Sequence, residues 1–131
     1  MIVDSSALIA IVKREPDADV FGQALRSAAE RPKIAAPTYL EASVVADGMD
    51  IRGGRRLDRL VGVSHLEIIP FDAEMARAAR AAYRDFGRGS GHPAQLNVGD
   101  CFSYALASVT GEPLLFQGND FTHTDIRSAL G

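Results

Sequence analysis

The sequence opens with MIVDSSALIAIV at residues 1–12, and this stretch sets the main expectation for the fold. Residues 1–3 form a short apolar run that Asp4 closes, which is typical of a buried strand that ends at a sheet edge. Over residues 7–12, apolar side chains recur at the spacing of one helix face, until Pro16 ends the pattern. The opening therefore predicts a buried strand followed directly by a helix.

The same alternation continues along the chain. Further short apolar runs predict strands at residues 33–36, 66–69 and 114–116. Helical spacing and capping patterns predict helices at residues 20–28, 37–48, 55–63, 75–82 and 99–110, and a last helix that Thr122 and Asp125 would cap. Strands that alternate with helices imply a parallel sheet covered on both faces. We therefore expect an α/β fold with one domain over residues 1–131.

Composition narrows the class of protein. A chain of 131 residues with 47% hydrophobic and 24% charged residues is ordinary for one soluble domain. The lone Cys101 excludes an intramolecular disulfide and favours a reducing cytoplasm. No apolar run approaches the roughly 18 residues of a membrane span, and the first run lacks the basic leader of a signal peptide. The net charge of −3 counts against a nucleic-acid partner unless metal ions supply positive charge.

Four acidic residues fall at one edge of the predicted sheet. Asp4 ends the first strand, and Glu41 lies in the first turns of the helix after the second strand. Asp100 starts the helix that precedes the fourth strand, and Asp120 lies just past that strand. Ligands of open parallel sheets bind beyond the carboxyl ends of the strands. These four side chains are therefore the candidates for a functional site.

Each acid taken alone has a structural interpretation. Acids at helix starts commonly cap N–H groups, which would explain Asp100 or Asp120, and Glu41 alone would be a solvated helix residue. Asp4 is harder to explain, because an acid beside buried neighbours needs a partner. Four converging carboxylates would repel one another, and no Lys or Arg is adjacent to any of them in the sequence. Mg²⁺ or Mn²⁺ with oxygen ligands resolves the conflict, and such an ion activates water and binds phosphoryl oxygens.

The motifs around these acids resemble those of a known family. Residues 1–8 resemble the start of the PIN-domain toxins, the VapC ribonucleases of bacterial toxin–antitoxin pairs. Residues 39–43, 96–102 and 114–121 resemble their second, third and fourth acidic motifs. Each motif is weak, but the ordered set spans the whole chain and is fairly specific. The resemblance implies a three-layer PIN-like fold, a short parallel sheet with helices on both faces.

The resemblance also assigns site residues. It implies that Asp4, Glu41, Asp100 and Asp120 are catalytic and that Asp4 and Asp100 bind the metal. Ser6 matches a position whose hydroxyl often borders the metal.

The fourth acidic position departs from the family pattern. Family members often carry an acid where this chain has Gly118. Asp120 is the expected substitute, and Asn119 is the alternative.

The activity implied by the resemblance is that of a Mg²⁺-dependent endoribonuclease, with Mn²⁺ as a possible substitute. Such an enzyme cleaves structured RNA such as tRNA or rRNA and acts as the toxin of a toxin–antitoxin pair. A VapB-like antitoxin encoded beside it silences the toxin, which is commonly a homodimer in the cytoplasm.

Two rows of arginines at helical spacing are either solvated faces or phosphate contacts, and the sequence does not decide which row faces the acids. The rows are Arg52, Arg55, Arg56 and Arg59, and Arg77, Arg80 and Arg84. The three histidines, His65, His92 and His123, show no metal-ligand spacing, so we expect them to be structural or exposed.

Three other interpretations compete with a nuclease. A haloacid-dehalogenase-type phosphatase needs Asp-x-Asp after the first strand, where this chain has Ser5 and Ser6 after Asp4. A receiver-like signalling domain needs paired acids there and an Asp at the apex of the third strand, whereas Asp72 follows Pro70 and Phe71. A catalytically inactive PIN module used for binding would not need to retain its acids.

Overall fold

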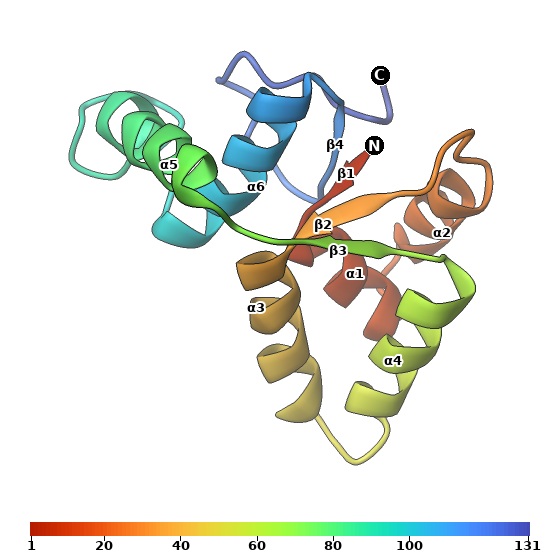
Figure 1. The fold of residues 1–131 in the computed structure, drawn as a ribbon. Coiled ribbons are helices and arrows are strands. Elements are labelled where there is room, and N and C mark those ends of the chain that lie inside the picture. Colours follow the sequence, from red (N-terminus) through yellow and green to blue (C-terminus); the bar gives the residue numbers. More distant parts are fainter.

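The structure is a computed structural model that describes residues 1–131 (Figure 1). Strands and helices alternate along the chain as expected. In chain order the elements are β1 (Ile2–Val3), α1 (Ser5–Val12), α2 (Ala18–Arg26), β2 (Lys33–Ala35), α3 (Ala36–Asp47), α4 (Gly53–Val63), β3 (Glu67–Ile69), α5 (Ala73–Phe86), α6 (Val98–Thr110) and β4 (Leu114–Leu115).

The four strands form one parallel sheet in the order β3-β2-β1-β4. Successive strand residues point to opposite faces, so Ile2 belongs to one hydrophobic core and Val3 to the other. Leu114 and Leu115 on β4 divide between the two cores in the same way. This double burial explains why β1 and β4 are short apolar runs without polar alternation, whereas β3 at the edge of the sheet has no buried residue.

The helices form a layer on each side of the sheet, as Figure 1 shows. Buried residues of α5 and α6 pack against one face, and buried residues of α1, α2, α3 and α4 pack against the other. The expected α/β three-layer arrangement is therefore confirmed. Because the strands are parallel, their carboxyl ends meet at one edge of the sheet. Helices α1 and α3 begin there, directly after β1 and β2.

Residues 48–52 separate α3 from α4, and the Gly53-Gly54 pair allows the two helices to pack closely. Both glycines lie in the first turn of α4. A Cβ atom at Gly53 would overlap the carbonyl oxygen of Ala46, and one at Gly54 would overlap the carboxylate of Asp47. Figure 1 shows the two helices as a hairpin that projects from the sheet.

The expected last helix is absent, so the capping role predicted for Thr122 and Asp125 is wrong. The chain after β4 contains turns and then runs beside β4, where Leu114 donates its N–H to the Arg127 carbonyl and accepts from the Ala129 N–H. Asp125 is engaged elsewhere, because it accepts a hydrogen bond of 2.6 Å from the Tyr104 hydroxyl of α6. Pairing with the sheet edge therefore replaces the helix that the local pattern suggested.

None of the helices combines the length and the apolar character that crossing a membrane requires.

Candidate active site

Asp4 is held in place at the junction of β1 and α1. Its side chain caps α1, where its Oδ2 atom accepts hydrogen bonds from the Ser6 N–H at 3.1 Å and from the Ser6 hydroxyl at 2.6 Å. Its Oδ1 atom accepts a hydrogen bond of 2.5 Å from the Ser103 hydroxyl on α6. Asp4 is only 5% exposed, so the fold positions a buried carboxylate with three donors.

Asp100 lies at the start of α6 in a capping box with Asn97. Its N–H donates to the Asn97 side chain at 2.8 Å, and its Oδ2 accepts from the Asn97 N–H at 3.0 Å. The pKa of the Asp100 carboxyl is raised to about 7, mainly by desolvation and also by the negative charges of Asp120, Asp4 and Glu41, whereas the hydrogen bond from the Asn97 N–H lowers it. Asp100 is therefore both part of the capping box of α6 and a member of an acidic cluster.

Glu41 approaches the cluster from α3. Its carboxylate lies against Gly99 of α6, where a Cβ atom would overlap it. Partial desolvation raises the pKa of the Glu41 carboxyl, and the charge of Asp4 raises it as well. The side chain remains exposed, so it stands at the mouth of the site.

The segment after β4 supplies Asp120 and is tied to Asp4. The Gln117 N–H donates to the Ser6 hydroxyl at 3.0 Å, and the same hydroxyl donates to Asp4. Gly118 follows with φ of 92°, a left-handed conformation that favours glycine. Asp120 is exposed, and its negative charge raises the pKa of Asp100; Asn119 is exposed as well. The structure thus brings all four predicted acids to one edge of the sheet.

No cation of the protein neutralises this cluster. The four ion pairs of the structure involve other acids. No three His, Cys, Asp or Glu side chains are close enough to hold a metal ion by themselves. Mg²⁺ usually binds through one or two carboxylates and keeps several water ligands. The donor set of hard carboxylate oxygens, with Asp4 and Asp100 as the buried pair, therefore fits such an ion.

Sequence reasoning missed two buried hydroxyls beneath the acids. Ser103 is 1% exposed and Thr38 is 0% exposed. Their spacing gave a signal, because Ser103 lies three residues after Asp100 and Thr38 three residues before Glu41. Residues three apart share one face of a helix.

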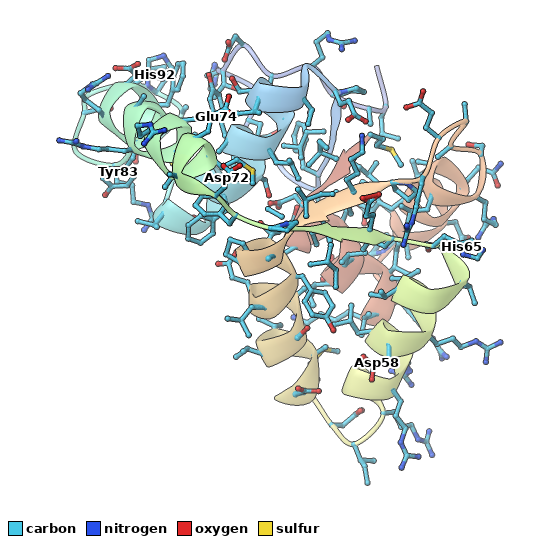
Figure 2. The ribbon with its side chains drawn as sticks, viewed as in Figure 1. Asp58, His65, Asp72, Glu74, Tyr83 and His92 are labelled. Carbon is cyan, nitrogen blue, oxygen red and sulfur yellow. The ribbon has the colours of Figure 1, made fainter.

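The histidines lie outside the cluster. Figure 2 shows His65 at the end of α4 and His92 in the loop beyond α5, at opposite ends of the molecule. The His92 ring packs edge-on against Phe86 and its Nδ1 accepts from the Ala94 N–H at 3.1 Å. His123 is exposed. None of the three histidines is among the groups that shift the pKa of Asp100 or Glu41.

The two arginine rows line different hollows. Arg80 of α5 lines an apolar hollow together with Val98 and Phe102, the residues on either side of Gly99, Asp100 and Cys101. The α4 row instead faces the end of α1, where Arg56 and Arg59 line a hollow with Arg14. Of the two rows, the α5 row is therefore the one that shares a hollow with sequence neighbours of Asp100.

Comparison with known proteins identifies the family. Residues 1–127 match the model of the PIN domain. The chain is 52% identical to Ribonuclease VapC42 of Mycobacterium tuberculosis over 98% of both chains, and 51% identical to Ribonuclease VapC28 of the same species over 99% of this chain and 98% of the other.

A solved structure supports the same fold. A chain of a toxin-antitoxin complex from Klebsiella pneumoniae matches with a TM-score of 0.71 at 20% identity, over 95% of this chain and 92% of the other. These matches decide against the phosphatase and receiver interpretations. The chain belongs to the PIN domain family, in the group of the VapC ribonucleases.

Proposed function

We propose that this chain is a metal-dependent endoribonuclease and the toxin of a toxin–antitoxin pair. The observation that carries the proposal is a cluster of four carboxylates with no protein cation, in which the pKa of Asp100 is raised to about 7. PIN-domain VapC ribonucleases are generally metal-dependent. Mg²⁺ is the proposed cofactor, with Mn²⁺ as a substitute, because both favour oxygen ligands.

Each acid has a distinct proposed role. Asp4 and Asp100 are the direct ligands, since their carboxylates are buried and fixed by hydrogen bonds. Glu41 and the exposed Asp120 bind through water, and the raised pKa of Glu41 suits it to accept a proton from the attacking water. When bound, the ion supplies a Lewis acid that polarises the phosphodiester and lowers the pKa of water.

The proposed substrate is structured RNA, such as tRNA or rRNA. A net charge of −3 makes local positive charge necessary for binding a polyanion. The α5 row, through Arg80 beside the start of α6, is the proposed phosphate contact.

The proposed protein partner is a VapB-like antitoxin that delivers an Arg or Lys into the acidic cluster. An unpaired group of carboxylates attracts such a cation. We also propose that residues 1–131 form a single cytoplasmic domain, supported by two cores on the faces of one sheet and by a lone, buried Cys101.

A homodimer is proposed from exposed apolar side chains near the site. Leu40 and Val44 on α3 are 61% and 63% exposed, and Val98 on α6 is 57% exposed. They flank Glu41 and Gly99, which touch each other, so they belong to one region. Val44→Asp should reduce the mass in light scattering to that of a monomer, whereas Val63→Asp on α4 should not. An unchanged mass for Val44→Asp would argue against this interface.

Cleavage of RNA by the purified protein tests the nuclease proposal. Total RNA is incubated with Mg²⁺, with and without chelator, and with Asp100→Asn. Asp58→Asn is the matched control, because Asp58 is exposed on α4, as Figure 2 shows, and is not among the charges that act on Asp100 or Glu41. We expect cleavage by the wild type and by Asp58→Asn only, and only without chelator. Cleavage by Asp100→Asn at the wild-type rate would refute the site.

A further inference from the structure

Two buried hydroxyl groups connect the elements that carry the acids. The Ser103 hydroxyl on α6 donates to Asp4 Oδ1 at 2.5 Å. The Thr38 hydroxyl on α3 lies 3.5 Å from the Ser103 hydroxyl, at the long limit of a hydrogen bond. Thr38, Ser103 and Asp4 therefore form a continuous polar path through the core, from α3 through α6 to the end of β1.

This path connects Asp4 with the helical turns that carry Glu41 and Asp100. Thr38 lies one turn before Glu41 on α3, and Ser103 lies one turn after Asp100 on α6. A buried hydroxyl costs free energy unless it forms hydrogen bonds. The neighbouring core positions Ala42 and Ala105 are apolar and fully buried. The Ser103 hydroxyl finds its partner in the Asp4 carboxylate, and the Thr38 hydroxyl finds its partner in the Ser103 hydroxyl.

Ser103 is the only donor to one oxygen of Asp4. The Oδ2 atom is held by the N–H and the hydroxyl of Ser6, whereas Oδ1 is held by Ser103 alone. An ionised carboxylate oxygen can accept more than one bond. The Ser103 hydroxyl thus fixes the plane of the carboxylate and leaves further lone pairs for a ligand.

We propose that Ser103, supported by Thr38, is a positioning residue that sets the orientation of Asp4 for binding a divalent cation. This inference rests on the proposed metal-dependent nuclease function. Ser103 does not touch the reacting atoms; it acts through Asp4. Groups that orient a metal-binding side chain typically change metal affinity about 10–100-fold when removed.

Calorimetric titration of the apo protein with Mn²⁺, without RNA, tests the inference. Ser103→Ala should raise the dissociation constant about 10-fold, at the low end of such effects. Ser103→Thr retains the hydroxyl and should restore affinity to within about threefold, on the same scale. Thr38→Val, which is nearly isosteric, should weaken binding by only a small factor, because its contact with Ser103 is long. The control is Ser43→Ala, which removes a partly buried hydroxyl of α3 bonded only to the Tyr39 carbonyl.

Kinetics separates positioning from general damage. For Ser103→Ala, kcat at fixed Mn²⁺ should fall while KM for RNA stays near the wild-type value, and saturating Mn²⁺ should recover most of the rate. If the wild type binds Mn²⁺ and a cooperatively folded Ser103→Ala binds it equally well, this inference is overturned and the nuclease proposal stands. If the wild type binds no Mn²⁺ at these acids, both are overturned. Equal weakening by Ser43→Ala would also overturn it, because the effect would then be structural.

Discussion

Replacing Asp100 with Asn should stabilise the apo protein above neutral pH. The pKa of the Asp100 carboxyl rises from 3.8 to about 7, chiefly through desolvation and then through the charges of Asp120, Asp4 and Glu41. Each pKa unit corresponds to about 1.4 kcal/mol, so the whole shift costs the folded apo protein at most about 4 kcal/mol at alkaline pH. Water and salt around the exposed Glu41 and Asp120 screen part of this cost, and we expect about 2 kcal/mol.

The sign of the pH dependence follows from proton binding. Below about pH 4 the carboxyl is protonated in both states and its cost vanishes. Between about pH 4 and pH 7 the unfolded chain releases this proton while the folded protein retains it, so the free energy of unfolding falls as pH rises. Asn has no such cost, keeps the shape of Asp, and can accept the Asn97 N–H.

Urea denaturation in chelator, from about pH 4 to about pH 8, measures the difference. The free energy of unfolding of Asp100→Asn should equal that of the wild type at the acidic end and exceed it by about 2 kcal/mol at the alkaline end. This difference corresponds to roughly 5–10 °C in melting temperature. Asp58→Asn should give a small, flat difference. A gain for Asp100→Asn that does not change with pH would refute the reasoning, because it could not come from this titration.

Four further predictions concern ligands of the site. Mg²⁺ or Mn²⁺ should raise the melting temperature of the wild type, because a ligand of the native state stabilises it by mass action, and replacing all four acids should erase the shift; a shift that survives would place the metal elsewhere. Asp120→Asn should slow cleavage and weaken Mg²⁺ binding about 10–100-fold, with Asn119→Ala doing much less; the reverse order in a paired assay would give the fourth position to Asn119. Arg80→Gln should raise KM for RNA with kcat little changed, whereas a larger effect of Arg59→Gln would move RNA to the α4 face. An antitoxin peptide should compete with Mg²⁺ in an affinity assay, and nuclease activity that persists under saturating antitoxin would contradict that mode of inhibition.

The sequence was sufficient for the sheet and for the placement of the acids, for a topological reason. Short apolar runs without polar alternation indicate strands buried on both faces, and parallel order brings their carboxyl ends to one edge. Asp4, Glu41 and Asp100 could therefore be grouped before any side chain was positioned. The same reasoning did not decide between Asp120 and Asn119, because both follow one strand and differ only in how the turn directs them.

Features that depend on contacts between distant parts of the chain could not be predicted from the sequence. Thr122 and Asp125 form a local capping pattern, but Asp125 is bonded to Tyr104 and the chain pairs with Leu114 instead of coiling. In the sequence, Ser103 is only a small residue on an apolar helix face. Its role becomes visible once the structure shows that α6 packs beside Asp4. The two arginine rows look alike in the sequence, and only the packing of α5 against α6 shows that Arg80 shares a hollow with Cys101, the neighbour of Asp100.

Locating the bound metal tests the central claim most directly. Crystals grown with Mn²⁺ give an anomalous-difference peak that marks the ion independently of any activity. We expect one peak within bonding distance of carboxylate oxygens of both Asp4 and Asp100, and no such peak in Asp100→Asn. A Mn²⁺ peak bound elsewhere in a protein that cleaves RNA, with none at these two acids, would contradict the account.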